Sequence, residues 1–205
     1  MYRFTDDDRR EIKAAVHTAE QRTSGEFVAV AARSSDSYRS VALLWSVAIA
    51  LMLPAPLLLF SPMRFLHIYQ LQIAIFILCM LLLEFVPSLH MALVPRRLRH
   101  ARASRLAHAQ FYEQGVHLTR EHCGVLLFVS LGERYVEIVA DQGIHERIGE
   151  QRWQAIVDHF LHKVGSGDAA GGFVQAISAC GEAMAEHYPA KPGDEDELSD
   201  GLIEI

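Results

Sequence analysis

The sequence SVALLWSVAIALMLPAPLLLFSPM occupies residues 40–63, and FLHIYQLQIAIFILCMLLL follows at residues 65–83. Neither stretch contains Asp, Glu, Lys or Arg. Each has about 20 residues, enough for a helix to cross the roughly 30 Å hydrocarbon core of a bilayer. The link Ser61-Pro62-Met63-Arg64 is too short to be a domain, so we predict a transmembrane hairpin with spans at about 40–62 and 65–86. The alternative is a pair of buried helices in a soluble core, but few soluble cores need two such runs side by side.

Basic residues beside the predicted hairpin indicate its orientation, because arginines on short flanks mark the cytoplasmic side of a span. The link carries Arg64, whereas the two flanks carry Arg33, Arg39, Arg96, Arg97, Arg99, Arg102 and Arg105. We therefore expect a multi-pass inner-membrane protein with both termini in the cytoplasm. An anionic inner leaflet would also attract these arginines, although a topology signal alone explains them. The three cysteines are scattered without a C-x-x-C pair, which agrees with a reducing compartment.

The polar segments on either side of the hairpin are predicted to complete one domain. The first 39 residues offer a helix that starts at Thr5 and one strand at 27–32, too little to bury a core. The order of strand, crossover and strand predicts a sheet that combines both segments. After the hairpin the pattern predicts a helix at 98–118, strands at 125–130 and 135–140, and helices around Trp153–Val164 and Phe173–Met184. Residues 1–38 and 96–188 are thus the two parts of the domain, and residues 39–95 are the hairpin.

The remaining residues, 189–205, form an acidic C-terminal tail. They contain six acidic residues and one lysine, and so account for most of the net charge of −6. This composition is typical of a mobile extension. The alternative is that Leu202, Ile203 and Ile205 dock onto the domain.

Several short segments resemble the TPM domain family. These are AEQRTSGE at 19–26 leading into FVAVAA at 27–32, GVLLFV at 124–129, Glu133-Arg134, and VEI at 136–138 followed by Gly143-Ile144. The resemblance covers about residues 5–35 and 105–187. It implies an α/β fold, a small layered α/β/α TPM-like domain, here interrupted by a two-helix transmembrane hairpin as in a bacterial branch of the family. Family members have been described as phosphatases, as metal-binding folds and as assembly factors, so the resemblance does not select a reaction.

The direction of the chain predicts a site at one membrane-facing edge of the sheet. The carboxyl ends of parallel strands are the usual place for ligand clefts, amides at a helix start can hold an anion, and clustered carboxylates can bind Ca²⁺ or Mg²⁺. Each candidate also has a structural alternative as a turn residue, a helix cap or a flexible glycine. The predicted ligand contacts are Ser34, Arg134, Gly171 and Gly172, and the predicted metal ligands are Asp36, Glu133 and Asp168.

A complete catalytic set is not apparent in the sequence. It contains no nucleophile elbow, dinucleotide fingerprint, nucleotide P-loop or zincin motif, and no basic-aromatic surface for nucleic acid. We therefore predict a non-catalytic module that contacts the lipid bilayer, binds a membrane-protein partner or lipid headgroups, and assists assembly or maintenance. The alternative is a divalent-metal-dependent phosphatase that uses Asp36, Glu133 and Asp168.

Overall fold

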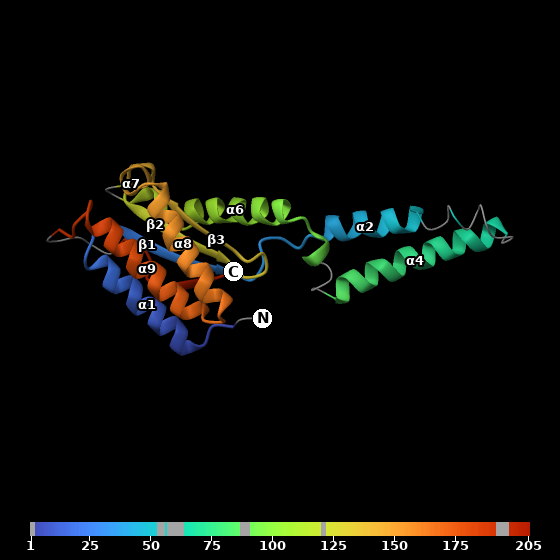
Figure 1. The fold of residues 1–205 in the computed structure, drawn as a ribbon, viewed down its shortest axis with the longest axis horizontal. Helices are drawn as coiled ribbons and strands as arrows, with labels where there is room; N and C mark the ends of the chain where they lie inside the picture. Colours follow the sequence, from blue (N-terminus) through green and yellow to red (C-terminus); the bar gives the residue numbers. More distant parts are fainter. Residues whose placement is uncertain (1–2, 53–55, 57–63, 87–90, 120–121, 192–196) are drawn as a thin grey trace. The chain divides into compact units, whose positions relative to one another are not determined.

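The chain folds into two compact units, which Figure 1 shows as ribbons. The computed structural model describes residues 3–52, 56, 64–86, 91–119, 122–191 and 197–205. Residues 1–35 and 100–205 form one unit, here termed the α/β unit, and residues 36–99 form the other, termed the hairpin unit. The α/β unit is therefore assembled from chain segments that precede and follow the hairpin unit.

A four-stranded mixed sheet lies at the centre of the α/β unit (Figure 1). Its strands are β1 (Glu26–Ala32), β2 (Gly124–Ser130), β3 (Tyr135–Ala140) and β4 (Leu202–Glu204), in the spatial order β3-β2-β1-β4. β1 pairs in parallel with β2, with Glu26 opposite Gly124 and Ala32 opposite Ser130, and β2 pairs with β3 in antiparallel fashion. Every residue of β1 and β2 is buried, as expected for strands that are covered on both faces. The sheet thus joins strands from both sides of the hairpin, as the sequence predicted.

Helices cover both faces of this sheet. On one face, α1 (Asp6–Glu20), α8 (Glu150–Gly165) and α9 (Ala169–Ala185) enclose a core with alternate residues of β1 and β2. On the other face, α6 (Arg96–Glu113) contributes Ala103, Ala107 and Phe111 to a second cluster with Val30 and Phe128. This alternation is the period-two pattern of a strand that buries both of its faces.

The helix ends follow from local sequence. Thr5 caps α1, and its side chain and that of Asp8 complete the predicted capping box. The helix predicted at 98–118 ends earlier, at Glu113, because Gly115 adopts a φ of 71° and a short 3-10 turn follows at Val116–Leu118. A further helix, α7 (Gln142–Ile148), was not predicted.

The end of the acidic tail is part of the sheet. Leu202–Glu204 forms β4 and pairs in parallel with β1, with Leu202 opposite Ala29. The side chain of Ile203 packs against the α6 side of the sheet, and Arg9 forms an ion pair with Glu204 at 2.7 Å. The prediction of a mobile extension is therefore wrong for these residues, because the open edge of β1 offers backbone hydrogen bonds and an apolar face.

In the hairpin unit, α2 (Arg39–Met52) packs against α4 (Phe65–Phe85). Arg39 at the start of α2 forms an ion pair with Glu84 at the end of α4, at 3.1 Å, so the two helices run antiparallel. Within the described part of the chain, α4 is the helix that is long and apolar enough to cross a membrane, by length and composition. The described α2 has 14 residues. The rest of the first predicted span and most of the predicted link fall on residues 53–55 and 57–63, outside the described residues.

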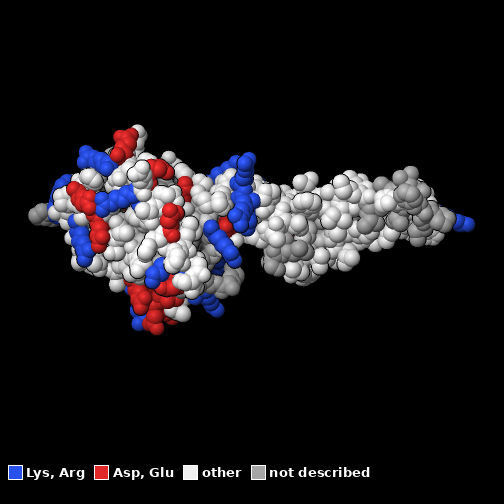
Figure 2. Space-filling model, in the orientation of Figure 1, with Lys and Arg blue, Asp and Glu red and all other residues white. Residues whose placement is uncertain are grey.

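The surface of the hairpin unit is apolar. Seven large apolar side chains of α2 and ten of α4 are exposed, among them Leu44, Met52, Phe65 and Phe85. On the face shown in Figure 2, this unit carries little charge, whereas acidic and basic side chains are mixed over the α/β unit. A continuous apolar surface of this kind marks a contact with a membrane or with another protein.

Candidate functional site

A buried carboxylate lies beyond the carboxyl ends of β1 and β2. Glu133 is 3% exposed, although it stands in the turn between β2 and β3. Its Oε1 atom accepts hydrogen bonds from the Ser34 hydroxyl at 3.1 Å and from the Ser35 N–H at 3.0 Å. Its Oε2 atom accepts from the hydroxyls of Ser35, at 3.4 Å, and of Ser130. We call this group, Glu133 with Ser34, Ser35 and Ser130, the serine cage.

The backbone holds the serine cage in place. The pairing of β1 and β2 continues past the strands, because the N–H groups of Leu131 and Gly132 donate to the carbonyls of Ala32 and Arg33, both at 3.0 Å. Arg134 closes the turn with a φ of 53°, a left-handed conformation that is uncommon for a residue with a side chain. The turn therefore lies beside the segment that leaves β1, and Glu133 joins the two through its side chain.

This arrangement satisfies the carboxylate internally. A buried carboxylate is stable only when donors surround it, and both oxygens of Glu133 have them. A cation at Glu133 would have to displace serine hydroxyls or turn them so that their oxygens face the metal. The geometry therefore fits a clamp between the exit of β1 and the β2–β3 turn, and it brings together two predicted site residues, Ser34 and Glu133.

Asp168 and the glycines after it form the start of α9. The Asp168 Oδ1 atom accepts a hydrogen bond from the Gly171 N–H at 2.9 Å, so Asp168 caps the helix. Its Oδ2 atom lies 3.5 Å from Lys163 Nζ. A Cβ atom on Gly171 would lie 2.3 Å from that same oxygen, and one on Gly172 would lie 3.3 Å from the Phe160 ring. An anion bound to these amides would have to displace the Asp168 carboxylate, which occupies the position that favours negative charge.

The side chains of the other two predicted residues, Asp36 and Arg134, are not part of the serine cage. Asp36 lies in the hairpin unit, where its Oδ1 atom accepts a hydrogen bond from the Tyr38 N–H at 3.2 Å. This bond stabilises a turn in which Tyr38 has a φ of 50°. Arg134 is exposed and forms no ion pair with a residue that the structure describes.

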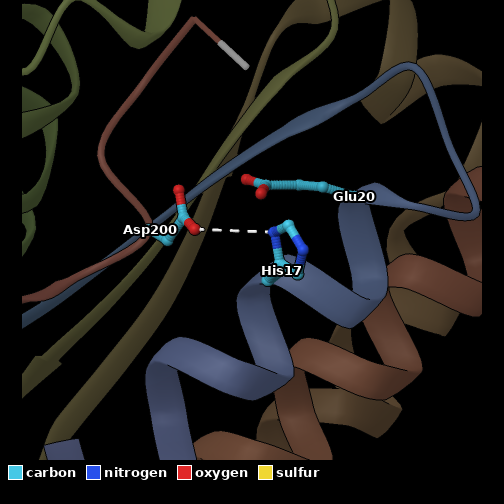
Figure 3. A group of neighbouring side chains, drawn as sticks. All are labelled: His17, Glu20 and Asp200. Carbon is cyan, nitrogen blue, oxygen red and sulfur yellow. Dashed lines mark ion pairs between the residues drawn. The ribbon is translucent and has the colours of Figure 1, made fainter. Parts of the chain in front are cut away.

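A different group has ligand atoms close enough to share a cation. His17 and Glu20 on α1 and Asp200 in the tail have one ligand atom each within 4.8 Å of one another (Figure 3). His17 Nδ1 lies 3.7 Å from Asp200 Oδ2, and Glu20 Oε1 accepts a hydrogen bond from the Phe27 N–H at 3.2 Å. One imidazole and two carboxylates are ligands that suit a divalent transition metal. Among the described residues, no group of three such ligands includes Asp36, Glu133 or Asp168.

Sequence reasoning did not find this second group. The His-x-x-Glu spacing on α1 was visible, since residues three apart share a helix face. No sequence pattern pointed to Asp200, because its position near His17 and Glu20 depends on the pairing of β4 with β1. Sequence reasoning also missed Ser35 and Ser130, which complete the serine cage.

A surface groove of about 380 Å³ lies between α1 and α9. Small side chains allow the two helices to approach closely, and a Cβ atom on Gly181 would lie 2.8 Å from the Cβ of Ala19. Arg22 and Glu11 contribute charge to its lining. The groove is distinct from the serine cage, which lies at the carboxyl ends of the strands.

The mixed sheet with helices on both faces defines a small α/β domain. Its candidate site lies at the carboxyl ends of two parallel strands. A family model described as the TPM domain, under a name that includes the word phosphatase, matches residues 88–183. Residues 88–183 are thus similar to the TPM domain. A solution NMR structure of the BA42 protein from the psychrophilic bacterium Bizionia argentinensis is similar in fold, with a TM-score of 0.62 at 17% identity. That match covers 100% of this chain and 97% of BA42. No curated protein matches the chain significantly.

Proposed function

We propose that this protein is an integral inner-membrane protein whose TPM domain works as a binding module at the cytoplasmic membrane surface. The helices α2 and α4 would form a transmembrane hairpin inserted into a layered α/β/α domain, with both termini in the cytoplasm. The module would bind a membrane-protein partner and assist its assembly or maintenance.

The observation that carries this proposal is the exposed apolar surface of the hairpin unit. Large apolar side chains cover α2 and α4, and of α4 only Ile68 and Leu83 are buried. In water this exposure would be unfavourable by roughly 25 cal/mol for each Å² of apolar surface, whereas in a bilayer the same surface contacts lipid tails. The Arg39–Glu84 pair then lies at the helix ends, where charged groups reach the interface.

The position of the insertion supports a role at the membrane surface. The chain leaves the α/β unit just after β1 and returns through α6. The carboxyl ends of β1 and β2, with Ser34, Arg134 and the serine cage, are thus next to the exit point in the chain. We propose that this edge faces the bilayer and receives the partner. The satisfied hydrogen bonds of Glu133 favour a rigid docking edge over a reactive site.

Two experiments test this proposal. Protease treatment of inside-out vesicles should digest both ends of the chain, and treatment of intact spheroplasts should spare both. Protection of one end in the inside-out vesicles would refute the proposed topology. A photo-crosslinker at Arg134, which is exposed in the turn between β2 and β3, should capture a membrane protein in cells, and a matched crosslinker at exposed Glu146 on α7 should not. Equal capture at both positions would refute a docking edge.

The second candidate is a divalent-metal-dependent phosphatase with Asp36, Glu133 and Asp168 as ligands of Ca²⁺ or Mg²⁺. The name of the matching family model favours it. The donor types suit these ions, but Glu133 and Asp168 are held by other partners. Hydrolysis of an artificial phosphate ester by the purified protein with Mg²⁺ would support this candidate if Asp168→Asn abolished it. Asparagine caps a helix about as well as aspartate, so that loss would report on chemistry rather than on folding.

A further inference from the structure

A nearly buried carboxylate in the C-terminal tail has an imidazole as its neighbour. The Asp200 side chain is 11% exposed, and Leu198 and Leu202 on either side of it pack against the two core clusters. Its carboxylate accepts no hydrogen bond from a residue in the described ranges, and its ion-pair contact there is with His17 Nδ1 at 3.7 Å. A carboxylate removed from water without donors is unfavourable unless a cation lies beside it. The surroundings of Asp200 therefore favour a bound cation.

Glu20 brings a second carboxylate to the same place. His17 and Glu20 are three residues apart on α1 and share a face of the helix. The side chains of these two residues and of Asp200 converge, with one ligand atom each within 4.8 Å of one another (Figure 3). Glu20 Oε1 also accepts a hydrogen bond from the Phe27 N–H at 3.2 Å. A carboxylate has about four lone-pair positions, so Glu20 can hold this N–H and a cation at the same time.

A protonated His17 alone does not satisfy this group. The 3.7 Å between His17 Nδ1 and Asp200 Oδ2 exceeds the hydrogen-bond range of about 2.7–3.2 Å. One positive charge would also leave one of the two carboxylates uncompensated, whereas a divalent cation balances both. In a tetrahedral zinc site with ligands at about 2.0–2.1 Å, neighbouring ligand atoms are about 3.3 Å apart. Small rotations of the three side chains would therefore complete such a site.

The contact on the other side of the imidazole also suits a metal ligand. The side-chain amide of Gln21 lies 3.1 Å from His17 Nε2, and an amide can donate or accept there according to which end faces the ring. When the amide oxygen accepts from Nε2–H, the lone pair lies on Nδ1, the nitrogen that faces Asp200. Histidines that bind metals usually have such a partner, which fixes the orientation of the ring.

We propose that His17, Glu20 and Asp200 bind Zn²⁺ and that the ion fastens the C-terminal tail to α1. Imidazole with carboxylates suits Zn²⁺, and three protein ligands leave one position for water. Asp200 lies two residues before β4, which pairs with β1 over only three residues, so the ion would stabilise a strand whose own pairing is short. The three ligands lie outside the residues that match the TPM family model, and the site does not depend on the proposed membrane insertion.

The first test measures zinc binding by the full-length protein in neutral detergent, after a chelator has removed metal. Competition between the protein and a chromogenic zinc indicator gives the affinity and the stoichiometry, and we expect one zinc ion per chain. Loss of an outer-shell partner alone weakens metal binding about 10–100-fold, so His17→Gln or Asp200→Asn should weaken it at least tenfold. Two control variants should leave it unchanged: His145→Gln, which removes an exposed imidazole 3.3 Å from Glu150, and Asp158→Asn, which removes an exposed carboxylate of α8.

Hydrogen exchange tests whether the ion fastens the tail. The Ile205 N–H donates to the Ala31 carbonyl at 3.1 Å, so it is protected while β4 is paired. At a free zinc concentration 100 times Kd, the population with a detached tail should fall about 100-fold. Exchange in the C-terminal peptide, followed by mass spectrometry, should slow by that factor in the parent protein and not in Asp200→Asn. Without zinc, the parent and this variant should exchange alike, which separates loss of the metal from loss of the fold.

Three results would overturn the proposal. Absence of zinc binding, or equal weakening in the site and control variants, would show that these three residues do not form a zinc site. Zinc binding that leaves exchange of β4 unchanged would show that the ion does not fasten the tail. Binding of Ca²⁺ or Mg²⁺ as tight as that of Zn²⁺ would show that the imidazole is not a ligand, because these ions prefer oxygen.

Discussion

Replacing Glu133 with alanine should destabilise the α/β unit more than replacing it with glutamine. In Glu133→Ala, the Ser35 N–H and the fully buried Ser130 hydroxyl lose their acceptor. Each buried group left without a partner costs about 1–3 kcal/mol, so we expect a loss of about 2–4 kcal/mol in the free energy of unfolding. In Glu133→Gln one oxygen can still accept from Ser35, and the serine hydroxyls can rotate to accept from the new amide, so the loss should be about 1–2 kcal/mol.

The assay is urea unfolding of the full-length protein in neutral detergent, followed by the fluorescence of Trp153. This side chain is buried on α8 and reports on the α/β unit. The second tryptophan, Trp45, lies in the hairpin unit, so all proteins carry Trp45→Phe. An unchanged slope of free energy against urea would show that the variants differ in stability rather than in the surface exposed on unfolding.

Two outcomes would refute this reasoning about the serine cage. If Glu133→Ala lowered the free energy of unfolding by less than about 0.5 kcal/mol, the value typical of a surface substitution, the serines would have found other hydrogen-bond partners. Equal losses for both variants would mean that the charge, rather than the number of acceptors, matters. If Glu133 instead served as a ligand of Ca²⁺, the ion would raise the urea midpoint of the parent protein and not that of Glu133→Gln.

Three further predictions use the same unfolding assay. Asp168→Ala should lower the free energy of unfolding by about 1 kcal/mol because the Gly171 N–H loses its capping acceptor, whereas Asp168→Asn should leave it nearly unchanged. Equal effects of the two substitutions would contradict the capping role. Gly181→Val should lower the free energy of unfolding by about 1–3 kcal/mol, because the valine side chain would collide with Ala19 and separate α1 from α9. A stabilised variant would show that the groove accepts the extra volume. Burial raises the pKa of the Cys180 thiol from 9.0 to about 12, so its contribution to stability is complete below pH 9 and is lost as pH rises toward 12. The free energy of unfolding should therefore fall less between pH 9 and 11 in Cys180→Ala than in the parent protein. Cys180 of the folded parent protein should also resist a thiol reagent at pH 8. Equal pH dependence of the two proteins, or rapid modification of Cys180, would contradict the burial argument.

The elements of the fold that depend on local pattern could be predicted from the sequence. Thr5 and Asp8 mark the start of α1, and the apolar strand at 27–32 is buried on both faces. The elements that were missed depend on distant partners. β4 has three residues and is stable because β1 offers it an open edge, and the Arg9–Glu204 pair joins two ends of the chain. Short strands of this kind carry little periodicity of their own.

Only one contact of the candidate site could be predicted from the sequence. Chain direction put Ser34 and Glu133 at the same edge of the sheet, and they share a hydrogen bond of 3.1 Å. The sequence predicted a solvated turn residue or a metal ligand at Glu133, because a glutamate in a turn is usually exposed. Its burial depends on the pairing of β1 and β2, which brings the hydroxyls of Ser35 and Ser130 within hydrogen-bond distance of its carboxylate. Whether Asp36, Glu133 and Asp168 act as metal ligands remains a prediction for the Ca²⁺ experiment.

The position of the hairpin unit in the chain is compatible with a stable sheet. β1 and β2 must pair across the crossover that contains this unit, with Ala32 opposite Ser130. The hairpin unit lengthens the crossover roughly threefold, which adds only about 1 kcal/mol to the entropy cost of loop closure. That cost is smaller than the expected contribution of Glu133 to stability, and the Ser34 and Ser35 hydrogen bonds act where the chain departs for the hairpin. The serine cage can therefore offset the insertion at its own junction, which gives the buried glutamate a structural role.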